Sequence, residues 1–274
     1  MEKEEQLELF REYLIEDEKS DNTIDNYIFS ANLYISMYGE LSKKNMIEYK
    51  KYVVSKYSPK TAANRCIAMN KFCDFKGMPE CKVKSVKIHK STTVENVITK
   101  EQCQIMLEGL KADGNEKGYW MIMFLSRTGA RVSELIMMDK KCLAKGVCEI
   151  WTKGKIRKIL IPDWLIEESR SYFEGVDGDY LFPSRYGGKM STRGVATNIN
   201  RWAKKYGIPE EVAHPHSFRH LFAIEFLKNN NNIALLSDLL GHESVDTTSI
   251  YLRLSANEQK RQFNDAVKKK KKNG

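Results

Sequence analysis

A basic segment without regular apolar spacing interrupts a chain that otherwise favours helices, and this interruption constrains the fold most. Residues 82–96 are rich in Lys, Ser and Thr and follow neither the helical nor the strand period. The chain has 274 residues, enough for two domains that each have a core. We therefore expect a helical domain over 1–85, a linker over 86–96, a second domain over 97–267 and a lysine-rich tail over 268–274.

The first domain has the pattern of a small helical bundle. Ser42 is suited to cap a third helix, and Ser58-Pro59 to start a fourth, because serine caps helix N-termini and proline fits the first turn. Apolar residues recur at helical spacing in four segments: Leu7, Phe10 and Leu14; Ile24, Tyr27, Ile28, Ala31 and Ile35; Met46, Tyr49 and Val53; and Ala62, Cys66, Met69 and Cys73.

The second domain is predicted to be mainly helical around one hairpin. Thr99 to Gln102 fits a capping box, and helices are expected from there to about Asp139. Val147–Trp151 and Ile156–Ile161 have strand character and are joined by a short polar turn that contains glycine. Helices are expected to resume after Ser191. The predicted fold class is mainly α with a small antiparallel β-sheet.

Composition excludes several classes of protein. The longest apolar stretch, Tyr119–Leu125, has seven residues, whereas a membrane span needs about 20. The N-terminus is acidic, unlike a secretory signal, so we expect a cytoplasmic protein. Six cysteines lack Cys-x-x-Cys or zinc-finger spacing, which predicts reduced, mostly buried thiols and no metal site.

The positive charge of the chain indicates a polyanionic partner. The net charge is +9, and residues 42–90 hold thirteen Lys and Arg against three acids. On the predicted fourth helix Lys60, Asn64 and Lys71 share one face, which we interpret as a candidate for contact with the major groove of DNA. A merely solvated face remains the alternative interpretation, both for this helix and for the basic surface as a whole.

Three clusters of polar residues carry the chemistry. Arg131 and Glu134 are three residues apart, so on a helix the carboxylate can orient the guanidinium. His216 and Arg219 share a second helical face. His242 follows Leu240-Gly241 and precedes a tyrosine, Tyr251, by nine residues. Arginine forks match phosphate oxygens, and imidazole moves protons near neutral pH. Each cluster alone is weak evidence, and together they favour phosphoryl chemistry.

In their order and spacing these clusters resemble the boxes of the tyrosine recombinases, the phage-integrase and Xer-type family. The form T-G-x-R-x-S-E-L matches 128–135, P-H-x-x-R-H matches 215–220, and L-G-H followed by T-T-x-x-Y matches 240–251. Lys153 falls where the family has a lysine in a hairpin turn. The resemblance implies a SAM-like core-binding domain, followed by an α+β catalytic domain of the DNA breaking-rejoining enzyme fold.

The resemblance also implies a role for each matched residue. Tyr251 is the expected nucleophile, and Arg131 and Arg219 would hold the phosphate oxygens. The role of base falls to His216, a phosphate hydrogen bond to His242, and the role of general acid to Lys153. Glu134 and His220 are expected to support these groups, one by orienting Arg131 and the other by bracing the second box. No cofactor, metal or ATP is expected.

The implied partner is a double-stranded DNA recombination site, on which four copies of the chain meet at paired sites, with a second recombinase as an open option. A helix after Ser255 is expected to dock into a neighbouring copy. A type IB topoisomerase shares the chemistry, but its additional large domains do not fit in 274 residues. A non-catalytic DNA-binding protein on the same scaffold is the alternative from another class.

Overall fold

The computed structural model describes residues 2–87, 96–152, 155–242 and 244–252. The chain forms two compact units, Met1–Lys90 and Ser91–Gly274. Most of the expected linker, the expected hairpin turn at Lys153, and the expected final helix and lysine tail lie outside the described residues. Each unit is treated separately below.

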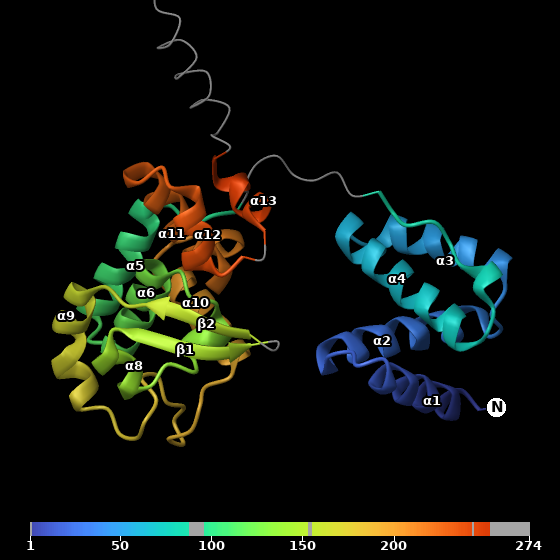
Figure 1. Ribbon diagram of the computed structural model, residues 1–274, viewed down its shortest axis with the longest axis horizontal. Helices are drawn as coiled ribbons and strands as arrows, with labels where there is room; N and C mark the ends of the chain where they lie inside the picture. Colours follow the sequence, from blue (N-terminus) through green and yellow to red (C-terminus); the bar gives the residue numbers. More distant parts are fainter. Residues whose placement is uncertain (1, 88–95, 153–154, 243, 253–274) are drawn as a thin grey trace, which may run out of the picture. The chain divides into compact units, whose positions relative to one another are not determined.

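The first unit is a bundle of four helices: α1 (Lys3–Glu16), α2 (Asp21–Tyr38), α3 (Lys43–Lys56) and α4 (Pro59–Phe75), followed by the 3-10 turn η1 (Pro79–Cys81) (Figure 1). Ser42 and Ser58 cap α3 and α4 as predicted, since their hydroxyls accept from Asn45 N and Thr61 N. The predicted apolar positions largely form the core, with Phe10, Leu14, Met46 and Tyr49 fully buried.

The second unit is mainly helical with one antiparallel hairpin, β1 (Val147–Thr152) and β2 (Lys155–Leu160), in which Ile150 pairs with Arg157 (Figure 1). The expected mainly α fold with a small antiparallel sheet is confirmed. Its helices are α5 (Lys100–Ala112), α6 (Glu116–Thr128), α7 (Val132–Leu135), α8 (Lys140–Lys145), α9 (Asp163–Glu174), α10 (Thr192–Lys205), α11 (Pro215–Asn229), α12 (Ile233–Leu240) and α13 (Val245–Thr248), with the 3-10 turns η2 (Glu210–Val212) and η3 (Ser249–Leu252).

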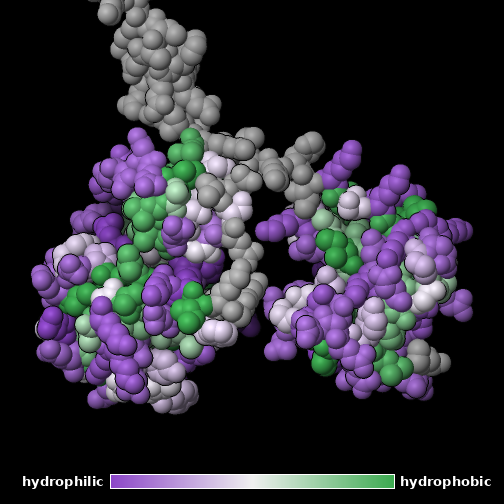
Figure 2. Space-filling model, viewed as in Figure 1, coloured by the Kyte–Doolittle hydropathy of each residue, from purple (hydrophilic) through white to green (hydrophobic). Residues whose placement is uncertain are grey.

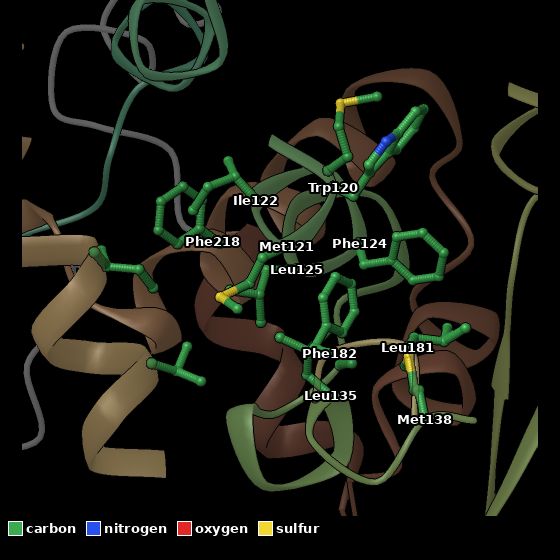
Figure 3. Packing of buried hydrophobic residues seen from close by; sticks show 14 of the residues in the cluster. Trp120, Met121, Ile122, Phe124, Leu125, Leu135, Met138, Leu181, Phe182 and Phe218 are labelled. Atoms are coloured by element: carbon green, nitrogen blue, oxygen red, sulfur yellow. The ribbon is translucent and has the colours of Figure 1, made fainter. Parts of the chain in front are cut away.

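The helix α6 is the centre of the second core (Figure 3). It is buried on nearly every side, because α5, α9 and α11 all pack against it. Phe218 of α11 joins the same cluster. This position explains the long apolar stretch in the sequence, since a helix that is hydrophobic all round belongs in a core. The core thereby fixes the start of α11, where the second box begins.

Two expectations from the sequence were wrong. The helix α9 lies in a stretch where no helix was expected before Ser191; it buries Leu165, Ser169 and Phe173 along one face. Cys142 and Cys148 form a disulfide across the end of α8, rather than remaining reduced. The chain reverses at Gly146, with a left-handed φ of 67°, and this brings the two cysteines together. The remaining four cysteines are free and buried as expected.

The surface is largely hydrophilic. On the face shown in Figure 2, hydrophilic residues dominate the surface of each unit, and hydrophobic residues form smaller patches on it. Among the described residues, no helix is both long and apolar enough to cross a membrane.

Gly129, the second residue of the first box, ends α6 with a left-handed φ of 62°. A Cβ at this position would lie 2.5 Å from a ring atom of Phe222 and 3.1 Å from Leu240. We expect Gly129→Ala to destabilise the second unit by about 2–4 kcal/mol, through backbone strain and overpacking. Urea unfolding followed by tryptophan fluorescence measures this, because all four tryptophans lie in the second unit.

Gly207→Ala is the matched control. Gly207 also has a left-handed φ, 70°, but a Cβ there meets open space. Gly207→Ala should lower the free energy of unfolding by only about 1 kcal/mol, the cost of a left-handed backbone at alanine. Equal losses in the two variants would show that Phe222 and Leu240 do not constrain the turn.

Candidate active site

The first box is organised by a buried carboxylate. Glu134 on α7 has no exposed surface. Its Oε2 accepts from the backbone N–H of Arg131 at 2.7 Å, and its Oε1 accepts from Arg131 Nη1 at 2.8 Å. The expected Arg131–Glu134 pair is therefore present as a capping arrangement at the start of α7. The Arg131 side chain remains 40% exposed, so Glu134 orients its guanidinium while solvent or a ligand can still reach it.

The second box places a guanidinium deep in the unit. Arg219 of α11 is 1% exposed. Its Nη1 donates to the Gly129 carbonyl at 2.8 Å, and its Nη2 donates to the Leu240 carbonyl. Its Nε has no hydrogen-bond partner among the described residues. Burial, with the nearby Arg131 and Arg157, lowers the pKa of Arg219 to about 9. Arg219 thus remains a cation at neutral pH.

Arg157 is a third guanidinium, which the sequence analysis missed. It lies on β2 with 8% exposure and approaches Glu134 Oε1 at 3.2 Å through Nε. It also donates to the Leu240 carbonyl and, at 3.1 Å, to the Leu239 carbonyl. The signal in the sequence was strand alternation, since Arg157 shares the inward face of the hairpin with Ile159.

The third box contacts the three arginines through its backbone carbonyls. The helix α12 ends at Gly241, whose φ is 58°, and a Cβ there would lie 2.8 Å from Arg157 Nη1. Arg131 Nη2 donates to the Gly241 carbonyl at 3.3 Å. His242 Nδ1 lies 2.7 Å from the Thr248 hydroxyl. Burial, with the arginines nearby, lowers the pKa of His242 to about 4, so the ring is neutral at pH 7.

The tyrosine of the third box lies against a histidine of the second. The hydroxyl of Tyr251, on η3, lies 2.7 Å from Nδ1 of His220. Tyr251 is 8% exposed, and burial raises its pKa to about 12 against the opposing effect of Arg219 and Arg131. The His216 ring stands edge-on to His220 at a centroid distance of 4.3 Å. The structure therefore brings together Arg131, Glu134, His216, Arg219, His220, His242 and Tyr251.

Lys153 lies outside the described residues; in the sequence it falls between β1, which ends at Thr152, and β2, which begins at Lys155. In the first unit, Lys60 and Asn64 are exposed on α4. Lys71 is instead paired with Asp17 at 2.8 Å and lies over the Tyr13 ring, so it is engaged within the bundle.

A groove of about 440 Å³ between α2 and α4 was not expected from the sequence. Asn64 and two further asparagines, Asn22 and Asn26, line it. Arg65 also lines it, with its guanidinium over the rings of Phe29 and Tyr57. Amide and guanidinium groups are those that read base edges, so this groove extends the candidate DNA surface beyond α4.

The site as a whole is positively charged. Arg131 and Arg157 contact the Glu134 carboxylate, and Arg219 lies near both arginines. Burial holds the His220 and His242 rings neutral, and at His242 the arginines add to this effect. Such a site suits an anion with several oxygens, because guanidinium groups bind phosphate oxygens in pairs. Within the described residues no cluster of three or more His, Cys, Asp or Glu side chains could hold a metal ion.

Comparison with known proteins identifies the class. Residues 96–258 match the model of the phage integrase family, and the chain belongs to this family. It is 28% identical over 261 residues to the tyrosine recombinase XerA of Thermococcus kodakarensis, covering 91% of this chain and 90% of that protein.

Solved structures agree with this assignment. The crystal structure of XerA recombinase matches with a TM-score of 0.55 and 25% identity, over 98% of this chain and all of that one. A lambda integrase dimer bound to a core site matches with a TM-score of 0.71 and 18% identity, over 91% of this chain and 76% of that one. The fold is therefore that of N-terminal helices followed by an integrase catalytic domain.

The buried position of Arg157 leads to a stability prediction. Arg157→Met removes one of the two cations on Glu134 and two donors to the end of α12. We expect a loss of about 3 kcal/mol from the second unit, the usual cost of breaking a buried ion pair. Urea unfolding followed by tryptophan fluorescence provides the measurement.

Lys158→Met is the matched control on the same strand. Its side chain is 68% exposed and faces Glu149, so the change should stay within about 0.5 kcal/mol. If both variants unfold at the wild-type midpoint, Arg157 does not stabilise the site.

Proposed function

We propose that this protein is a site-specific DNA recombinase that cuts and rejoins DNA through a 3′-phosphotyrosine, for integration, excision or resolution of DNA. One observation carries the proposal: the hydroxyl of the buried Tyr251 contacts His220 of α11, near the arginines of the first two boxes. Membership of the phage integrase family supports the same chemistry.

In the proposed reaction the Tyr251 oxygen attacks a scissile phosphate. A bond forms between that oxygen and phosphorus, and the bond from phosphorus to the 5′-oxygen breaks. Arg131 and Arg219 bind the non-bridging oxygens and stabilise the charge of the pentacoordinate state. His242 adds a hydrogen bond to the phosphate. Attack by a 5′-hydroxyl of the partner strand then reverses the step and exchanges the strands, without ATP.

Two proton transfers accompany this step. A histidine of α11 accepts the phenol proton, and the family resemblance assigns that role to His216. Lys153 donates a proton to the leaving 5′-oxygen. Its place in the sequence between β1 and β2 supports this assignment, because Arg157 anchors β2 to the carbonyls beside the arginine cluster.

The proposed partner is a duplex recombination site, bound by both units. Lys60 and Asn64 of α4 contact DNA in this proposal. Lys71, near the end of the same face, would reach DNA only by leaving its ion pair with Asp17. The similarity to an integrase dimer bound to a core site supports duplex binding. Strand exchange needs four cleavages, so we propose a homotetramer on paired sites, with or without a second recombinase, acting in the cytoplasm.

A non-catalytic DNA-binding protein is the second candidate function. The sites of the two candidates differ in one respect, the need for a nucleophile. A binding module has no use for a tyrosine hydroxyl held by a histidine, so the contact between Tyr251 and His220 favours the enzyme.

Removing the Tyr251 hydroxyl tests the enzyme directly. Tyr251→Phe should abolish the covalent protein–DNA adduct on nicked DNA and leave DNA affinity within about threefold, because one oxygen is lost and the ring stays. Denaturing gels measure the adduct and gel shifts measure binding, with wild type as the reference. An adduct that persists in the variant would identify a different nucleophile, and a wild type that binds its site without an adduct would favour the binding module.

A sulfur substitution tests the acid. Lys153→Ala should slow single-turnover cleavage by about 10²-fold or more, as expected for loss of a general acid. A substrate with sulfur at the bridging 5′ position should recover most of that rate, since a thiolate leaves without protonation. Arg131→Ala is the control that sulfur should not rescue. Without differential rescue, Lys155 becomes the next candidate for the acid.

A further inference from the structure

The contact between Tyr251 and His220 joins the tyrosine hydroxyl directly to an imidazole nitrogen. Nδ1 of His220 is 2.7 Å from the phenol oxygen, the distance of a good hydrogen bond. The two rings are tilted by 54° with centroids 5.5 Å apart, so the contact is made by polar atoms and not by stacking. The oxygen that this contact fixes is the one proposed to attack DNA.

Packing holds both partners in place. Tyr251 belongs to a small core of its own with Ala223, Leu227, Leu236 and Leu240. His220 lies one turn before Ala223 on α11, half-buried and edge-on to His216. Since η3 packs directly on α11, the phenol and the imidazole meet without either side chain reaching into solvent.

The two histidines of α11 differ in exposure. His216 is exposed, whereas His220 is partly buried beneath it. The more accessible ring is better placed to meet the phosphate of bound DNA, and the inner ring to serve the tyrosine.

We propose that His220, rather than His216, is the proton acceptor for the nucleophile, with the Tyr251 phenol donating to Nδ1 and the ring proton on Nε2. This proposal rests on the proposed recombinase function. As the bond from the phenol oxygen to phosphorus forms, the phenol proton moves to Nδ1, the 5′-oxygen leaves, and the general acid protonates it. In the reverse step His220 returns the proton to the tyrosine.

The protonation states of the free protein are consistent with this role. Burial, and then the neighbouring His216, lower the pKa of His220 to about 4, so Nδ1 has a lone pair at any pH at which the enzyme would work. The charged and titratable groups that face the pair are His214, His216, Arg219 and His242 around the imidazole, and Arg131 and Arg219 around the phenol. A bound phosphate adds negative charge and raises the proton affinity of the imidazole when transfer occurs.

The test compares His220→Ala with His216→Ala on pre-bound nicked DNA in single-turnover cleavage between pH 6 and 9. Wild type should be nearly flat with pH. His220→Ala should be slower by about 10²-fold or more at pH 7, and its rate should rise about tenfold per pH unit, because the reaction then depends on the phenolate fraction. Added imidazole should restore at least tenfold of the lost rate. His216→Ala should keep the flat profile and gain nothing from imidazole.

A structural role for His220 would give a different result, since misfolding is not repaired by imidazole or by raised pH. His220→Asn extends the test. Its amide reaches the position of Nδ1 and should preserve folding by tryptophan fluorescence, but it cannot accept a proton and should show the same pH slope as the alanine variant. If the slope and the rescue belong to His216→Ala instead, the proposal is overturned.

A second measurement does not depend on cleavage. The chain has five histidines, so ¹⁵N NMR can resolve the ring nitrogens. His220 should be the Nε2–H form in the free wild type, and its Nδ1 resonance should shift in Tyr251→Phe. An unchanged Nδ1 resonance would overturn the proposal. If the Nδ1 resonance shifts in Tyr251→Phe but the wild-type protein never forms an adduct, the recombinase function is overturned and the contact between Tyr251 and His220 stands.

Discussion

The burial of one carboxylate organises the site. Glu134 has no exposed surface, and an unpaired buried charge costs several kcal/mol, so cations must surround it. Arg131 and Arg157 provide them. Arg157 and Arg219 in turn share the Leu240 carbonyl, which the end of α12 presents. One network therefore ties α7, β2, α11 and α12 together, and every box of the sequence meets in it.

Local signals in the sequence predicted much of this arrangement. The Thr99 capping box, the Ser58 cap and the hairpin formed as expected, because each depends on residues within one or two turns. The three boxes also identified residues that the structure places together, from Arg131 to Tyr251. Their grouping could be predicted only because the family pattern carries tertiary information that spacing alone lacks.

What the sequence could not show depends on partners distant in the chain. Arg157 becomes part of the site through Glu134 and through carbonyls 82 and 83 residues away. Lys71 shares a helical face with Lys60, yet it is paired with Asp17, which directly follows α1. The contact of His220 with Tyr251 spans 31 residues and depends on how η3 packs on α11. In each case the sequence did not show the distant neighbour.

Burial keeps the Tyr251 phenol of the free protein protonated, although the surrounding arginines act to lower its pKa. Burial is the main cause that lowers the pKa values of His220 and His242 to about 4 and so holds both rings uncharged. His216 adds to the effect on His220, and Arg219 adds to the effect on His242. The Tyr251 phenol, with a pKa of about 12, stays protonated beside a weakly basic imidazole. A phosphodiester would offset part of the positive charge and make the imidazole more basic. Under the proposed function, the tyrosine therefore becomes a nucleophile only when the DNA substrate is bound.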